Sequence, residues 1–288
     1  MSESPQKNNI THEELISDIE GYKSLAKILL ERTGIYMDSS DKNFSLMSNR
    51  MHRVLKKHDC NSYKDYIKLI ESGVTDIMNE FLEVLTTNTT HFFRENEHFS
   101  FLKKSLSIIE KDLEKEKRNE IRVWCAAASS GEEPYTILMT ILEYLGNYPK
   151  LNIKMQATDL NTQVLEKAKL GIYRPEISEN ITPDLLLKYF DKNLNTQYYQ
   201  VKEKFRNMIE FTKFNLRNET YSFPYKFDVI FCRNVMIYFT QDLVEQTILK
   251  LSSCLSKKGY LFIGHSEAMI GDKHKLKSVI PAVYQHMT

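Results

Sequence analysis

Apolar residues recur at helical spacing from the N-terminus to about residue 90. Thr11 and Glu14 have the spacing of a capping box, in which each side chain satisfies a free backbone N–H of the other residue. Gly34 can end the helix that follows, because glycine readily adopts the left-handed conformation found at helix C-termini. Ser62 resembles the start of a second capping box. We therefore predict a helical domain over residues 1–90. The apolar face of its first helix comprises Leu15, Ile19, Tyr22, Leu25, Ile28 and Leu29.

Residues 46–58, LMSNRMHRVLKKH, separate into two faces when they are placed at about 100° per residue. One face is apolar and comprises Met47, Met51, Val54 and Leu55. The other face is basic and comprises Arg50, Arg53, Lys56 and Lys57. A solvated charged face is the usual explanation of such a helix, and a surface for an acidic partner is the alternative.

The pattern of apolar residues changes after residues 110–120. These residues are almost entirely charged and are predicted to form a solvated helix end or a linker. Beyond them, short β-rich runs alternate with helical stretches, which indicates an α/β fold with right-handed crossovers and a mainly parallel sheet. Residues 191–211 contain strand-forming residues without a helical partner and predict a small antiparallel insertion. The second domain is thus expected at 91–288, with a β-subdomain at about 190–211. Its predicted strands are 121–126, 153–158, 208–214, 227–232, 260–264 and 282–286, and its main helices are 134–145, 162–170 and 243–255.

Charge and cysteine content narrow the class of protein. The 39 Lys and Arg against 38 Asp and Glu give a net charge of +1, which argues against a nucleic-acid partner. The four cysteines form no CxxC pair, and no histidine pair has metal spacing, so we expect reduced thiols and no metal. The N-terminal MSESPQKNNI is polar, and no later apolar run reaches membrane length, which predicts a cytoplasmic protein.

The run IRVWCAAASSGEEPYTI, residues 121–137, carries the first candidate chemistry. A strand leads into small residues that let a ligand approach the backbone, and Glu132 and Glu133 then stand at the start of a helix. A dinucleotide pyrophosphate requires glycines and free N–H groups there, whereas carboxylates repel phosphate. They suit an ammonium group, a sulfonium or ribose hydroxyls, and S-adenosylmethionine has all three. The alternative is a tight turn whose acidic residues only favour the helix dipole.

Asp159 ends the second predicted strand, where an acidic residue chelates the ribose hydroxyls of Rossmann-like sites. The alternative for this residue is a helix N-cap, with Thr162 competing for that role. Together with the acidic loop, Asp159 favours an adenosine cofactor, and a methyl donor over NAD.

These residues occur within longer runs that resemble a known protein family. The chain resembles the CheR chemotaxis methyltransferases in the runs LTTNTTHFFRE (85–95), RVWCAAASSGEEPYTI (122–137), ATDLNTQVLEKAKLGIYR (157–174), FDVIFCRNVMIYF (227–239) and GYLFIGHSE (259–267). The resemblance implies an N-terminal all-helical domain followed by a Rossmann-like class I methyltransferase domain with a small antiparallel β-subdomain. It also implies transfer of a methyl group from S-adenosylmethionine to glutamate side chains of chemoreceptors.

The resemblance also implies which residues carry this activity. Arg94 has a forked donor that suits a carboxylate of the methionine moiety or of the substrate, and a surface helix arginine is the alternative. Tyr238 follows Asn234 in the same loop and is expected at the methyl-transfer site, with packing as the alternative. A substrate glutamate is already ionised near neutral pH, so an in-line displacement needs no strong general base, and His91 and His265 are expected to be structural. The expected cofactor-binding residues are Asn88, Thr90, Arg94, Glu133, Asp159, Asn215, Leu216, Asn234 and Val235.

The family resemblance suggests a partner for the basic helix as well. Arg50, Arg53, Lys56 and Lys57 are expected to contact the glutamate-rich methylation helices of the receptor. Some family members bind a receptor tether peptide through a glycine-flanked loop, but residues 191–199, DKNLNTQYY, lack Gly-x-Gly, so we expect a tether-independent enzyme. We also expect it to be a monomer. A non-catalytic signalling module on the same fold is the alternative, and a dehydrogenase is disfavoured by the missing glycines.

Overall fold

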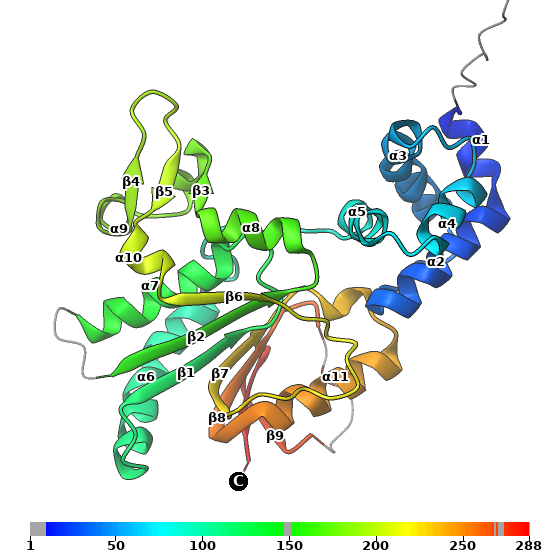
Figure 1. The fold of residues 1–288 in the computed structure, drawn as a ribbon. Helices are drawn as coiled ribbons and strands as arrows, with labels where there is room; N and C mark the ends of the chain where they lie inside the picture. The colour runs from blue at the N-terminus through cyan, green and yellow to red at the C-terminus, as the bar shows by residue number, and fades with distance from the viewer. Residues whose placement is uncertain (1–9, 147–150, 268, 270–273, 288) are drawn as a thin grey trace, which may run out of the picture. The chain divides into compact units, whose positions relative to one another are not determined.

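The computed structural model describes residues 10–146, 151–267, 269 and 274–287, so most of the polar N-terminal segment considered above lies outside the described residues. The chain divides into two compact units, Met1–Thr87 and Asn88–Thr288. The CheR-like motifs of the sequence lie in the second unit, apart from the first residues of the run 85–95. Figure 1 shows the ribbon of each unit.

The first unit is all helical, as predicted. Thr11 and Glu14 form the expected capping box, and Gly34 ends a helix in the left-handed conformation with φ of 83°. The prediction of one continuous first helix is wrong, because the Asp18 side chain accepts a hydrogen bond from the backbone N–H of Gly21 and thereby starts a new helix. The helices are α1 (His12–Ser17), α2 (Ile19–Thr33), α3 (Asp41–Lys57), α4 (Tyr63–Glu71) and α5 (Thr75–Leu85).

Helix α3 contains the predicted two-faced segment. Its apolar positions Met47, Met51, Val54 and Leu55 are all buried, and α3 packs against α1 and α5. The apolar spacing of this segment therefore predicted its core face correctly.

The second unit is built on a seven-stranded sheet in the order β6-β2-β1-β7-β8-β10-β9 (Figure 1). The first five strands in this order pair in parallel, and β10 and β9 add an antiparallel edge. The sequence missed β9 and placed the start of β8 five residues late. The strands are β1 (Glu120–Cys125), β2 (Asn152–Asp159), β6 (Ile209–Lys213), β7 (Phe227–Cys232), β8 (Leu255–Ile263), β9 (Leu276–Ile280) and β10 (Val283–His286).

Strand β1 lies between β2 and β7, so the chain continues from it first to one side of the sheet and later to the other. The carboxyl ends of β1 and β7 therefore flank the topological switch point, where open α/β sheets bind their ligands. This places the loops that follow these two strands next to each other.

Alternating side chains of the sheet contribute to two apolar cores. Val123 and Cys125 belong to one core together with residues of α6 (Glu97–Lys115) and α7 (Glu132–Leu145). Trp124 belongs to the core on the opposite face, which α11 (Gln241–Cys254) covers. Aromatic rings of the segment after β6 surround this indole, with centroids 4.7 Å from it at Phe223 and 5.4 Å at Phe214.

A small antiparallel sheet with the order β3-β5-β4 accompanies the main one (Figure 1). The predicted insertion at 191–211 contains most of β4 (Phe190–Lys192) and all of β5 (Tyr199–Val201), but β3 (Ile172–Tyr173) comes earlier in the chain. The insertion also holds a one-turn helix, α10 (Glu203–Arg206), that periodicity could not reveal. Helices α8 (Thr162–Leu170) and α9 (Pro183–Tyr189) and the 3₁₀ turn η1 (Pro175–Glu179) lie between β2 and β4 along the chain.

The charged segment 110–120 ends α6, as predicted, but it is not wholly solvated. Arg118 donates hydrogen bonds of 2.7 Å and 2.6 Å to the two carboxylate oxygens of Asp228, and these side chains are 17% and 6% exposed. Asp228 also accepts from the backbone N–H of Arg122 and from the hydroxyl of Ser256. This buried ion pair ties the start of β7 to the start of β1.

Two further properties of the described residues bear on the sequence predictions. None of the helices there is both long and apolar enough to cross a membrane. The four cysteines are buried and unpaired.

Asp228→Asn should lower the free energy of unfolding by about 2 kcal/mol, because it removes the buried counter-charge of Arg118 and leaves the half-exposed Glu116, 3.2 Å from Nη2, to pair with it. Chemical denaturation of the wild type and the variant measures this difference. An unchanged midpoint would show that Arg118 finds another partner.

Candidate active site

The acidic loop after β1 makes a tight connection into α7. The backbone N–H of Ala128 donates to the carbonyl of Thr158 at 2.9 Å, which holds the loop against the end of β2. Gly131 has φ of 101°, and a Cβ there would lie 2.7 Å from the hydroxyl oxygen of Tyr173. This position therefore accepts only glycine, and Glu132 begins α7 directly after it.

Asp159 lies at the end of β2 and faces this loop. Its Oδ2 accepts a hydrogen bond of 2.9 Å from the backbone N–H of Ser129, and its Oδ1 accepts one of 3.0 Å from the backbone N–H of Asn161. Asn161 is the N-cap of α8, through bonds that its side chain accepts from the start of the helix. The alternative role of Asp159 or Thr162 as that cap is therefore wrong.

Asn88 and Thr90 precede the motif that carries Arg94. The Ser129 hydroxyl donates to the carbonyl of Asn88 at 3.0 Å, so Ser129 joins Asn88 and Asp159 at one place. Thr90 is half-buried. Arg94 donates through Nη1 to the carbonyl of Thr89 at 3.0 Å, which occupies one arm of its guanidinium.

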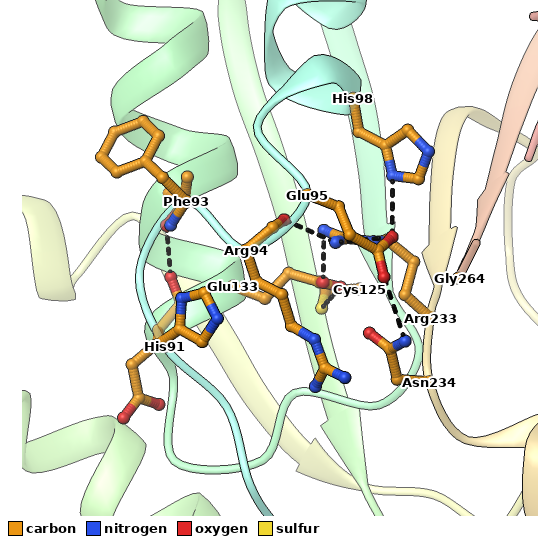
Figure 2. A network of polar contacts seen from close by, with 12 residues as sticks. His91, Phe93, Arg94, Glu95, His98, Cys125, Glu133, Arg233, Asn234 and Gly264 are labelled. Atoms are coloured by element: carbon orange, nitrogen blue, oxygen red, sulfur yellow. Dashed lines mark hydrogen bonds and ion pairs between the residues drawn. The ribbon is translucent and has the colours of Figure 1, made fainter. Parts of the chain in front are cut away.

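Arg233, the first residue after β7, is the centre of a polar network (Figure 2). Its side chain is fully buried, with Nη2 3.1 Å from Oε2 of Glu95 and Nη1 2.8 Å from Oε2 of Glu133. Nη2 also donates to the backbone carbonyl of Arg94 at 2.6 Å, and the guanidinium lies 5.4 Å from the ring centroid of Phe99. Figure 2 shows the guanidinium of Arg94 pointing away from this network.

The loop after β7 carries the remaining predicted pocket residues. Asn234 adopts the left-handed conformation, with φ of 58°, and its side-chain amide donates to Oε1 of Glu95 at 3.2 Å. The backbone N–H of Val235 donates to the carboxylate of Glu267 at 2.9 Å. Tyr238 is half-buried and ends the 3₁₀ turn η2 (Met236–Tyr238).

The electrostatics of the site are dominated by carboxylates. Burial raises the pKa of Glu133, the neighbouring Glu95 and Glu267 raise it further, and Arg233 and the Cys125 thiol, which donates at 3.4 Å, oppose the rise. Burial would also raise the pKa of Glu95, but Arg233 and the Asn234 amide hold it below the ordinary value.

The number of carboxylates at the site, which exceeds the number of guanidinium groups, indicates which kind of ligand the site fits. Asp159 accepts hydrogen bonds from the backbone N–H groups of Ser129 and Asn161, Glu132 accepts one from the Ser130 hydroxyl, and burial raises the pKa of both acids. Among the described residues these two carboxylates therefore add to the pair that shares Arg233, and carboxylates outnumber guanidinium groups at this end of the sheet. A phosphate would add to that charge, whereas a ligand with cationic groups and hydroxyl donors would relieve it. The residues present therefore fit a sulfonium cofactor that carries a ribose.

Comparison with known proteins agrees with this geometry. The model of the CheR methyltransferase SAM-binding domain matches residues 88–284, and that of the CheR all-alpha domain matches residues 20–86. The chain belongs to the CheR methyltransferase family. It is 39% identical to a chemotaxis protein methyltransferase of Borreliella burgdorferi, over 96% of this chain and 95% of that protein. Chemotaxis protein methyltransferases of Escherichia coli and Salmonella typhimurium are 37% and 35% identical, each over 85% of this chain and 83% of theirs.

Membership in the CheR family confirms the fold class and the cofactor that the sequence predicted. The second unit is the family's SAM-binding domain, and the first contains its all-alpha domain. S-adenosylmethionine is thus the cofactor whose charge the carboxylates at the switch point suit.

Two predicted cofactor residues after β6 have other contacts in the structure. The side chain of Asn215 accepts from the backbone N–H of Arg217 at 2.9 Å. Leu216 is 7% exposed and packs in the core around Trp124. Its carbonyl accepts from the hydroxyl of Tyr221 at 2.5 Å. The side chain of Leu216 therefore supports the sheet.

Glu95, His98 and His265 form a cluster whose ligand atoms lie within 4.8 Å of one another, which is close enough for a metal ion to be considered. Glu95 is already paired with Arg233 at 3.1 Å, and the guanidinium charge opposes a second cation. Burial, assisted by Arg233, lowers the pKa of His98 to about 4, so this imidazole is neutral at pH 7.

The predicted basic face of α3 is used partly by the first unit itself. Arg50 donates to the carbonyls of Leu85 at 2.9 Å and Thr86 at 3.3 Å, so it caps the C-terminus of α5. Lys57 pairs with Glu80 at 2.7 Å. The remaining two positions of that face, Arg53 and Lys56, are exposed.

Three charged residues of the site, Glu95, Arg233 and Glu267, were not predicted from the sequence motifs. A signal was present for Arg233, because an arginine directly after the six-residue apolar run 227–232 must be buried with a partner or turn out to solvent. Which of these occurs depends on whether carboxylates from elsewhere in the chain reach it.

The neutral state of His98 predicts a pH dependence of stability. A histidine whose pKa falls from 6.5 unfolded to about 4 folded contributes stability above pH 6.5 that is lost as pH falls toward 4. His98→Phe keeps an aromatic ring and removes this titration. When the pH is lowered from 7 to 4.5, the Tm of the wild type should therefore fall more than the Tm of His98→Phe. The same substitution at exposed His91 is the control, and parallel acid loss in wild type and His98→Phe would refute the assignment.

Proposed function

We propose that this CheR family member transfers a methyl group from S-adenosylmethionine to glutamate carboxylates in the cytoplasmic part of chemoreceptors. The observation that carries the cofactor half of this proposal is the surplus of carboxylates at the switch point, around Glu133 and Asp159. The acceptor half is supported by relatives that are named chemotaxis protein methyltransferases and match 96% and 85% of the chain.

The residues that would hold the cofactor come from the carboxyl ends of β1, β2, β6 and β7 and from the segment before α6. Asp159 would accept hydrogen bonds from the ribose hydroxyls, and Glu133 would face the cationic part of the ligand. Asn88, Thr90 and Arg94 would line the pocket from the segment before α6. Asn215 and Leu216 would flank the adenine, in the case of Leu216 by its backbone, since its side chain is in the core. Asn234 and Val235 would lie next to the transferred methyl.

When bound, S-adenosylmethionine supplies an electrophilic methyl group on a sulfonium. The acceptor glutamate is ionised near neutral pH, so no residue of this chain would be needed as a general base, and S-adenosylhomocysteine would be the leaving group. Arg94 would orient a carboxylate through the part of its guanidinium that does not bond Thr89, and Tyr238 would close the site beside Asn234. Catalysis is then positioning and exclusion of water, which is sufficient for an in-line displacement.

Recognition of the receptor would use the basic face of α3. Arg53 and Lys56 are its best candidates because both are exposed, and Lys57 can contribute after release from Glu80. Arg50 would contribute least, since its guanidinium caps α5. An acidic methylation helix would be steered by such a face.

The enzyme is proposed to act as a cytoplasmic monomer without need of a receptor tether. The turn between β4 and β5 is closed by its own side chains, with Asn193 Oδ1 accepting from the backbone N–H groups of Asn195 and Thr196. This loop lacks the glycines of the tether-binding members of the family.

Radiolabelled S-adenosylmethionine should label a chemoreceptor cytoplasmic fragment equally well with and without its C-terminal tether. Arg94→Ala and Asp159→Ala should each weaken S-adenosylhomocysteine binding by about 10- to 100-fold in calorimetry, because each removes charge-assisted hydrogen bonds.

Lys111→Ala, an exposed lysine of α6, is the matched control and should keep both activities. Asp159→Ala also loses two backbone contacts, so its fold must be checked by circular dichroism. Cofactor binding without labelling of any receptor fragment would indicate the non-catalytic alternative.

Reversal of the charge at Arg53 and Lys56 to glutamate should lower receptor labelling about ten-fold at low salt and leave S-adenosylhomocysteine affinity unchanged. The effect should shrink at high ionic strength, where the steering is screened. The control reverses the same charge at exposed Lys23 and Lys64. Equal losses in both double variants would show that net charge, and not this face, matters.

A further inference from the structure

Glu267 lies in the turn that follows β8 and is 8% exposed. Its carboxylate accepts hydrogen bonds from four backbone N–H groups. Oε1 accepts from Val235 at 2.9 Å and from Met236 at 2.7 Å. Oε2 accepts from Asn234 at 3.1 Å and from Gly264 at 2.5 Å. Both oxygens are thus occupied by the backbone of the segment 234–236 and of the turn itself.

These amides take the place of a cation. Burial raises the pKa of Glu267, and within the described part of the chain the groups that oppose this rise are the backbone N–H groups of Gly264, Asn234, Met236 and Val235. Successive N–H groups that converge on one point form an anion-binding concavity. The backbone of residues 234–236 therefore needs an anion at this point, and Glu267 supplies it.

The conformation of this loop is constrained at Asn234 and at Gly264. Asn234 is held at φ of 58°, which costs free energy for a residue with a side chain. Gly264 packs so closely that a Cβ there would lie 2.6 Å from the Asn234 side-chain nitrogen. On its other side, the Asn234 amide donates to Glu95. The loop is thus held between two carboxylates, Glu267 through its backbone and Glu95 through a side chain.

We propose that Glu267 is a positioning residue of the methyl-transfer site, which holds the backbone of the loop after β7 so that Asn234, Val235 and Tyr238 are presented to the cofactor and the acceptor. This inference rests on the proposed roles of those residues. Glu267 does not touch the reacting groups, and its effect passes through the four amides it accepts from.

Glu267→Gln is a sharp test because glutamine has the same size but only one acceptor oxygen. In either orientation of the amide, its NH₂ group faces two of the four N–H donors, either those of Val235 and Met236 or those of Asn234 and Gly264. We expect S-adenosylhomocysteine affinity or kcat of receptor methylation to fall about ten-fold or more, measured well below the Tm of every variant.

Asp228→Asn is the matched control, since it alters a buried acid near the start of β7, at the opposite end of that strand from the loop that Glu267 holds. It should lower Tm while S-adenosylhomocysteine affinity and kcat stay within about two-fold of the wild type. Glu267→Gln with a lowered Tm but unchanged affinity and kcat would overturn the proposal, because Glu267 would then be merely structural. Equal loss of function in both variants would overturn it as well.

Gly264→Ala is the second variant, in case Glu267→Gln does not fold. It keeps the Glu267 side chain but crowds its contact with the loop, since a Cβ there would lie 2.6 Å from the Asn234 side-chain nitrogen and 3.0 Å from both the Asn234 backbone nitrogen and Oε2 of Glu267. It should therefore lower affinity or kcat in the same direction, and normal values for both would also overturn the proposal. Wild type that binds S-adenosylhomocysteine but labels no receptor would refute the acceptor assignment alone, and the affinity test of Glu267 would still stand. Wild type that binds no S-adenosylhomocysteine would refute both.

Discussion

The site depends on the ion pairs that the buried guanidinium of Arg233 makes with Glu95 and Glu133. A cation with a fully buried side chain is tolerated only with counter-charges and hydrogen bonds, and here these come from Glu95, Glu133 and the carbonyl of Arg94. The three partners belong to the segment before α6 and to the start of α7, far from β7 in sequence. Their convergence draws the Arg94 motif, the acidic loop and the loop after β7 to the same edge of the sheet.

The same edge shows two ways of stabilising buried carboxylates. Glu95 and Glu133 share a guanidinium, whereas Glu267 is satisfied by backbone amides. The amides order a loop that contains a strained residue, and the guanidinium leaves negative charge in excess. Order in the loop and excess charge around it are both properties that a site for a sulfonium needs, since positioning and electrostatic complementarity carry most of such a reaction.

Helix α3 shows what a periodic sequence pattern can predict and what it cannot. The apolar positions that it predicted are all buried, because the side of a helix that faces a core is set by spacing alone. The partner of each charged side chain on the opposite face was not predictable from spacing. Arg50 reaches the C-terminus of α5 and Lys57 reaches Glu80, because long side chains bind whatever acceptors the neighbouring helix presents.

The sequence by itself determined most of the helices and parallel strands along the chain, the acidic loop, the acid at the end of β2 and the family. These are properties of local spacing and of runs of neighbouring residues. Only the tertiary structure decided that Arg233 is buried, that Asn161 rather than Asp159 caps α8, and that Glu267 supports the loop after β7. Each of these outcomes depends on which partner a polar group finds. A partner that is distant in sequence is brought near by the order of the strands in the sheet, and local sequence patterns do not encode that order.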